Sequence, residues 1–230
     1  MQIYNSTSEK WHFTKYGTPE ECYKKYCIET RFGKNTAHEY INLLKYEYDE
    51  KFVDLSNTHI NKWNNLVKIF GNVINGRVLD IGGPGLGAMF LLRRRWDLSE
   101  IISIDGNKYS IEAFRPHLDK KIKSICCDFS WFPEISGEFD TILQIDFAEH
   151  VSDDLYKKIT KWALSKMKQN GSLIIYTPEF PNCIDQLEHI SVKSTGFFLN
   201  FFLSLGLTAY VEVNNGRIFM VVRKEKNVLL

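Results

Sequence analysis

Apolar and polar residues follow two different periods along the chain, and the change comes near residue 76. Before it the period is helical. Residues 18–21 (Thr-Pro-Glu-Glu) and 36–39 (Thr-Ala-His-Glu) each place a glutamate three residues after a capping threonine. A third helix is indicated by apolar residues that share one face, Ile60, Trp63, Val67 and Phe70. Gly71 lies where that helix should stop, so we expect a helical N-terminal cap or lid over residues 1–75.

After residue 76, short β-rich runs alternate with helical segments. The runs that predict strands are residues 77–81, 100–105, 122–128, 139–146 and 172–177. Helices are expected after the glycines that follow the first run, around residues 111–118, and from a Ser152 cap to Asn170-Gly171. Strands and helices that alternate in this order predict a parallel sheet covered on both faces.

The last part of the chain departs from this alternation. After a helix around residues 193–205, two β-rich runs flank Asn214-Asn215-Gly216. Asn-Gly is the strongest short signal for a hairpin, so the final strand should run antiparallel to its neighbours. The expected fold class is α/β, with a seven-stranded, mostly parallel sheet over residues 76–230, an antiparallel last strand and the helical cap.

Composition and charge narrow the function classes. The 230 residues are 44% hydrophobic and 25% charged, which is typical of a globular domain with an appendage. Lys and Arg number 29 against 28 Asp and Glu, so neither nucleic acid nor a membrane surface is expected as a partner. The five cysteines fit neither a disulfide framework nor a zinc motif. We expect a cytoplasmic protein with no metal and a small-molecule substrate.

The segment Val78–Ala88, VLDIGGPGLGA, carries the strongest chemical signal. Glycines between a strand and a helix let the backbone approach a ligand and expose the amides of the helix N-terminus. Read from Gly83, the segment matches the dinucleotide fingerprint G-x-G-x-x-A, and Asp105 lies near the expected position of the ribose-binding acid. An NAD(P)-dependent oxidoreductase is therefore one interpretation, and a purely structural turn is another.

Three features argue against the oxidoreductase. Asp80 stands directly before the glycines, where a carboxylate would repel a pyrophosphate and favour a ligand that carries positive charge. No Tyr-x-x-x-Lys pair is present to supply the acid of short-chain reductases. The closing hairpin also replaces a second mononucleotide-binding half.

Residues from about 76 to 223 resemble a class I S-adenosylmethionine-dependent methyltransferase of the small-molecule type, with a Rossmann-like sheet. Residues 78–82 resemble the first motif of that family, Asp105 resembles the acid that binds the ribose, and residues 139–151 are similar to its fourth-strand motif. The resemblance implies S-adenosylmethionine as cofactor. Pro84 and Leu86 replace later motif glycines, so Gly83, Gly85 and Gly87 are expected to supply the turn. The residues expected to bind the cofactor are Asp80, Gly82, Gly83, Gly85, Asp105, Asp128, Phe129 and Asp146.

Methyl transfer to an alcohol needs a base for the hydroxyl proton, and histidine suits this role because its side chain titrates near ~6.5. His150 is the first candidate, since it follows the fourth strand at the edge where open α/β sheets bind ligands. His189 is the second, in the loop after the fifth strand. Glu149 could orient either histidine or meet a cationic acceptor. The alternative for all three is a structural role, and Asp153 and Asp154 are interpreted as helix-capping acids.

The predicted function is methyl transfer to a small molecule, at a hydroxyl such as that of a sugar or glycan precursor, with an amine as the nearest variant. The Asn/Asp-Pro-Pro-Tyr motif of enzymes that methylate planar nitrogen is absent. A non-catalytic, methyltransferase-like partner subunit is the remaining alternative. Aromatic residues near the N-terminus could line an acceptor pocket or only pack the cap: Trp11, Phe13, Tyr16, Tyr23 and Tyr26.

Overall fold

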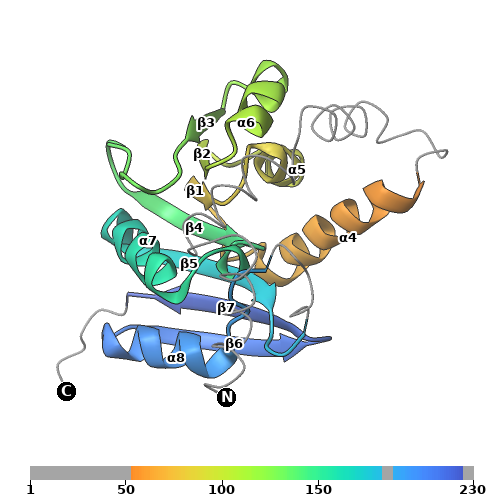
Figure 1. Ribbon diagram of the computed structural model, residues 1–230. Coiled ribbons are helices and arrows are strands. Elements are labelled where there is room, and N and C mark those ends of the chain that lie inside the picture. Colours follow the sequence, from red (N-terminus) through yellow and green to blue (C-terminus); the bar gives the residue numbers. More distant parts are fainter. Residues whose placement is uncertain (1–52, 183–188, 225–230) are drawn as a thin grey trace.

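A seven-stranded sheet runs through the part of the chain that the structure, a computed structural model, describes: residues 53–182 and 189–224 (Figure 1). The strand order is β3-β2-β1-β4-β5-β7-β6. The strands are β1 (Arg77–Ile81), β2 (Glu100–Asp105), β3 (Ile122–Cys126), β4 (Phe139–Ile145), β5 (Met167–Pro178), β6 (Thr208–Asn214) and β7 (Arg217–Arg223). Only β7 runs against its neighbours, β5 and β6. The predicted fold class is therefore confirmed.

Helices cover both faces of this sheet (Figure 1). The α-helices are α4 (Val53–Phe70), α5 (Leu86–Arg94), α6 (Lys108–Phe114), α7 (Asp153–Ser165) and α8 (Thr195–Ser204), and the 3-10 turns are η3 (Arg115–His117) and η4 (Ala148–His150). Successive strand residues point to opposite faces. Val78 joins the core under α4 and α5, whereas Leu79 and Ile81 join the core under α7 and α8.

The N-terminal cap is described only in part. α4 ends at Phe70, directly before Gly71, as predicted. Its residues Trp63, Leu66 and Phe70 are buried in the core that α4 shares with α5. The two helices predicted from residues 18–21 and 36–39 lie outside the described residues, as do the N-terminal aromatic residues.

The boundary between α7 and β5 differs from the prediction. The helix ends at Ser165 instead of continuing to Asn170-Gly171, and Met167 already begins β5, paired with Phe139 of β4. The register between the two strands shifts after this pair, so the polar residues 168–170 form an exposed irregularity. Met167 is fully buried in the sheet. The predicted helix therefore extends too far, and Met167 belongs to the strand.

Two other boundaries follow local chemistry. α6 stops at Phe114 and passes into the 3-10 turn that contains Pro116, because proline disfavours helical geometry in the residue before it. Leu118, which the spacing predicts to be helical, therefore lies beyond the end of α6. The hairpin between β6 and β7 is confirmed, with positive φ angles at Asn215 (50°) and Gly216 (70°), the conformation that its turn requires.

The carboxyl ends of the central strands meet at one edge of the sheet, where open α/β sheets bind ligands. β1 ends next to Gly82, β2 ends at Asp105, and β4 is followed by Asp146 and the η4 turn. The structure thus brings together the segments on which the candidate site residues lie. None of the helices in the described ranges combines the length and apolar character that a membrane span would need.

Candidate active site

Two glycines of the loop after β1 have backbone conformations that favour glycine. Gly82 has φ 85°, and Gly85, the N-cap of α5, has φ 105°. A Cβ atom on Gly82 would lie 2.6 Å from the Phe147 ring, so the loop packs directly against the segment that follows β4. A Cβ atom on Gly83 would collide with the Asp80 carboxylate. The turn therefore depends on Gly82 and Gly85, while Gly83 leaves room for the carboxylate.

The third glycine of the expected turn, Gly87, has a packing role. It lies inside α5, and a Cβ atom there would lie 2.5 Å from the Trp63 ring of α4. The prediction that Gly83, Gly85 and Gly87 supply the turn is thus only partly followed. Gly82 shapes the turn, and Gly87 does not.

Asp80 is an acid in a buried position, with only 3% of its surface exposed. The Ser103 hydroxyl donates a hydrogen bond of 3.1 Å to its Oδ2. Burial raises the pKa of Asp80 to about 6, and the nearby charge of Asp105 adds to this, whereas Ser103 and Lys62 lower it. A cationic ligand group beside this carboxylate would offset the cost of its burial.

The acids after β2 and β3 are both half-buried and shape their own loops. Asp105 Oδ1 accepts a hydrogen bond of 2.6 Å from the backbone N–H of Asn107. Asp128 Oδ1 accepts from the backbone N–H of Ser130 at 3.0 Å and from its hydroxyl at 2.6 Å. Each carboxylate thus has a fixed orientation at the ligand-binding edge.

Phe129 has a positive φ angle of 60°, and its ring is buried in the core. The ring centroid lies 6.3 Å from that of Phe132 and 6.0 Å from that of Phe147. The side chain is therefore a packing group, and any ligand contact from this position would come from the main chain.

Asp146, directly after β4, is held between two cations. Lys62 of α4 donates to its Oδ2 at 2.8 Å, and Arg217 of β7 donates to its Oδ1. Burial alone would raise the pKa of Asp146, but the two cations outweigh it and hold the pKa at about 2. Asp146 also has a φ angle of 49°. Its carboxylate therefore ties α4 and β7 to the end of β4.

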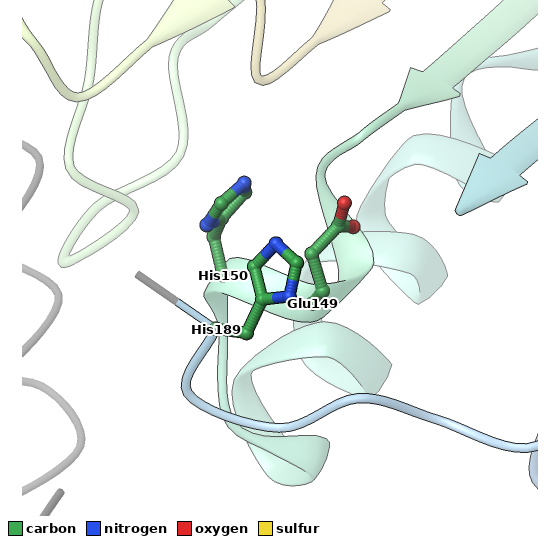
Figure 2. A group of neighbouring side chains, drawn as sticks. All are labelled: Glu149, His150 and His189. Carbon is green, nitrogen blue, oxygen red and sulfur yellow. The ribbon is translucent and has the colours of Figure 1, made fainter. Parts of the chain in front are cut away.

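Glu149, His150 and His189 form a buried cluster at the same edge. Figure 2 shows the three side chains grouped together, two from η4 and one from the segment before α8. One potential ligand atom from each lies within 4.8 Å of the others. The imidazole centroids are 5.2 Å apart and the rings meet nearly edge to face. Exposure of the three ranges from 1% to 7%.

The Glu149 carboxylate lies in an environment that disfavours its charge. Burial, together with the negative charge of Asp146, raises the pKa of Glu149 to about 7, although a hydrogen bond of 2.9 Å from the Thr177 hydroxyl lowers it. A carboxyl group with such a pKa can take up or release a proton near neutral pH.

A buried lysine braces the two segments that carry the cluster. Lys193 is fully buried, and its ammonium donates to the carbonyls of Ala148, Val151 and Ser191 at 2.8–2.9 Å. Its Nζ also lies 3.4 Å from Asp153 Oδ1. Asp153 is therefore more than the helix-capping acid that the sequence predicts, because it also pairs with this lysine.

No protein-family model matches the sequence, and a comparison with curated proteins gives no match. Solved structures do match. The DhpI complex with SAM and HEP is 17% identical, with 84% of this chain and 99% of that chain covered at a TM-score of 0.59. The plantazolicin methyltransferase BpumL in complex with SAH is 10% identical, with 97% and 100% covered at 0.64. An O-methyltransferase family protein from Burkholderia thailandensis is 14% identical, with 85% and 64% covered at 0.59.

The chain has the fold of a class I S-adenosylmethionine-dependent methyltransferase. In this fold the candidate residues separate into two neighbouring groups. One surrounds the loop after β1 and includes Asp80 and Asp105; the other is the cluster after β4. The contact between Gly82 and Phe147 joins them, because Phe147 directly precedes η4.

Four residues of the candidate site escape sequence reasoning: Lys62, Thr177, Lys193 and Arg217. Arg217 follows the Asn-Gly turn at the start of the predicted final strand, but only the observed pairing of β7 with β5 places it opposite Pro178, at the ligand-binding edge. Thr177 closes the predicted fifth strand, which could have placed it there. Lys62 and Lys193 lie in segments whose patterns give no sign of their partners.

Proposed function

We propose that the protein is an S-adenosylmethionine-dependent methyltransferase that acts on a hydroxyl group of a small molecule. One juxtaposition supports this most strongly. The glycine loop with its buried Asp80 packs, through Gly82 and Phe147, against the turn that carries Glu149 and His150. The residues that we assign to the cofactor and the candidate bases therefore lie next to each other. The similarity to structures of methyltransferases that hold SAM or SAH points the same way.

The chemistry of the first subsite fits the cofactor. Asp80 is buried, and this burial, with the nearby charge of Asp105, raises its pKa, so a positive charge beside the carboxylate would be favourable. The ammonium group of the cofactor's methionine part would supply that charge. Asp105, at the end of the adjacent strand, would accept hydrogen bonds from the ribose hydroxyls. Gly82, Gly83 and Gly85 would bring the backbone close to the ligand, and Asp128 and the main chain of Phe129 would flank the adenine.

When bound, S-adenosylmethionine supplies a methyl group on a positively charged sulfur. The acceptor oxygen would form a bond to the methyl carbon as the carbon–sulfur bond broke, with that electron pair left on sulfur. The hydroxyl proton passes to His150, our first candidate for the base, with His189 as the second. Glu149 would orient the imidazoles, and Asp146 would keep the end of β4 in position through Lys62 and Arg217.

A small, oxygen-bearing acceptor fits both the site and the charge of the chain. The base candidates are needed for a hydroxyl, whose proton must leave as the new bond forms. The formal charge of +1 offers no general attraction to polyanions. A sugar hydroxyl is one such acceptor. A neutral amine would need the base less, since its nitrogen is nucleophilic enough to attack the methyl carbon before it loses a proton.

Ligand-induced stabilisation tests the cofactor assignment. S-adenosylhomocysteine at about 100 times its Kd should stabilise the protein by roughly 2.7 kcal/mol, or about 5–10 °C in Tm for a chain of this size. NADH should give no shift. Asp105→Ala should reduce the shift produced by S-adenosylhomocysteine. A shift with NADH alone would support the oxidoreductase instead.

A second experiment tests the base. Methyl transfer from labelled cofactor is measured against a panel of small alcohols, sugars and amines. His150→Ala should lower turnover of the accepted alcohol by roughly 10²–10⁴-fold while cofactor binding stays unchanged. Unchanged turnover in the variant would remove His150 from this role.

A further inference from the structure

The Glu149, His150 and His189 cluster has a donor set that cations use. Two imidazoles and one carboxylate are the three protein ligands found in several catalytic zinc sites, which keep a fourth position open. The same set suits other first-row dications such as Fe²⁺. Bonds of about 2.0–2.2 Å place the ligand atoms of a tetrahedral site roughly 3.3 Å apart. The separations within 4.8 Å would therefore close onto one ion by rotation of the two histidine side chains.

The charge around Glu149 also favours a cation. The side chain is 1% exposed, and burying a carboxylate is costly unless it is paired. Among residues 53–182 and 189–224, no lysine or arginine forms an ion pair with Glu149, because the nearby Lys62 and Arg217 are bound to Asp146. The Thr177 hydroxyl donates to Oε2 at 2.9 Å, which fixes the carboxylate orientation as an outer-shell partner would.

The backbone under the cluster is braced before any ligand binds. Lys193 links the carbonyl of Ala148, which precedes Glu149, to that of Ser191, which lies two residues after His189. The backbone N–H of Ser191 donates to the Glu149 carbonyl at 3.1 Å. The two segments that supply the three side chains are thus joined directly, as a preorganised binding site requires.

We propose that Glu149, His150 and His189 bind one first-row divalent transition-metal ion, of which Zn²⁺ is the type, with an open position that faces the acceptor. The expectation of no metal rests on the cysteine pattern, which gives no sign of this site because the site uses no cysteine and His189 lies far from Glu149 and His150 in the sequence. Binding of the ion stands on the cluster alone. Its role rests on the proposed methyltransferase function: the ion would coordinate the acceptor hydroxyl.

With the ion bound, each imidazole uses one nitrogen as a ligand, and activation of the hydroxyl passes from His150 to the metal. Coordination would lower the pKa of the acceptor hydroxyl group, so that its proton would leave to solvent water before the oxygen reacts. That oxygen then attacks the methyl carbon as above. The cation would also supply Glu149 with a positively charged partner, which no described lysine or arginine provides.

The test is a titration of the tag-free, full-length protein, freed of metal by dialysis against a chelator. Co²⁺, which has visible absorption bands, is added first, and Zn²⁺ is then used to displace it. We expect one equivalent of Co²⁺ to bind with bands typical of four or five ligands. His189→Ala and the near-isosteric Glu149→Gln should each weaken binding by more than the roughly 10–100-fold that outer-shell changes cost.

His117→Ala is the matched control, because His117 lies in η3, after α6, and not in the cluster. Its Co²⁺ affinity should equal that of the unaltered protein. The proposal is wrong if no stoichiometric Co²⁺ binds, or if His117→Ala weakens binding as much as His189→Ala. Circular dichroism of each variant verifies that it folds.

The same chelator-treated sample separates this proposal from the methyltransferase proposal. Stabilisation by S-adenosylhomocysteine without Co²⁺ binding refutes the metal site alone. Co²⁺ binding by the cluster without stabilisation by S-adenosylhomocysteine supports the metal site and refutes the cofactor assignment.

Discussion

Replacing Asp80 by asparagine should stabilise the ligand-free protein at pH 8 and weaken its binding of S-adenosylhomocysteine. Asparagine has nearly the same shape and can still accept the hydrogen bond from Ser103. The change removes a buried negative charge. The fold and the proposed site therefore place opposite demands on this one position, as is common at functional sites.

The magnitude follows from the pKa of Asp80. Burial raises it from 3.8 to about 6. Because the folded state holds the proton more tightly than the unfolded state, stability falls as the pH rises through this interval and stays lower above it. About 2 pKa units at 1.36 kcal/mol each amount to roughly 3 kcal/mol. Asp80→Asn should recover up to that amount at pH 8, a Tm gain of roughly 6–12 °C, and almost nothing at pH 4.

Urea unfolding at pH 4 and pH 8 measures the effect, and Asp140→Asn is a control of opposite sign. Although Asp140 is partly buried, the Arg77 N–H and the Lys168 ammonium lower its pKa. Its charge therefore contributes stability above pH 4, and the asparagine variant should be less stable at pH 8. If Asp80→Asn changes stability equally at both pH values, or lowers it at pH 8, the reasoning from burial is wrong.

Two further predictions concern the ion pairs of the site. Lys193→Met should lower the free energy of unfolding by roughly 3–5 kcal/mol, because it leaves three buried carbonyls and Asp153 without their cation; Lys168→Met, at an exposed pair, should cost less than about 1 kcal/mol in the same urea assay. Asp146 has a lowered pKa, so its stabilisation is complete above pH 4 and is lost as the pH falls towards 2. Asp146→Asn should lower the free energy of unfolding by roughly 2 kcal/mol at pH 7 and make it depend less on pH between pH 4 and pH 2. An unchanged pH dependence in this range would contradict the pairing with Lys62 and Arg217.

The fold was predictable because its signals are local. The glycines after a short strand, the Ser152 cap and the Asn-Gly turn each specify their own segment, and their order implies the sheet. Local signals do not assign a residue whose side chain fits both a helix and a neighbouring strand. Met167 satisfies both a helical apolar face and a strand, and only its pairing with Phe139 places it in β5.

The candidate site was predictable only in its acids and histidines, whose residue types stand out at strand ends. Their partners depend on which distant side chains meet. Nothing in the sequence distinguishes Lys62 from the other lysines, because its partner Asp146 is brought to α4 only by the fold. Lys193 likewise resembles a surface lysine in the sequence, although three carbonyls surround its ammonium in the structure. Burial, which decides the pKa of Asp80 and Glu149, is likewise a property of the folded chain.

The three acids nearest the proposed reaction centre have different environments, and this difference assigns them different tasks. Lys62 and Arg217 pair with Asp146, so its carboxylate ties α4 and β7 to the end of β4, while its contact with the cofactor stays a prediction. Asp80 is buried beside the glycine loop with its pKa raised to about 6, so in the proposed site it would favour a cationic group of the cofactor. Glu149 lies next to two imidazoles, and burial together with the charge of Asp146 raises its pKa. Asp146 binds the nearby cations and also repels the Glu149 carboxylate. Of the three acids, Glu149 would therefore be stabilised most by a positive charge on the acceptor side.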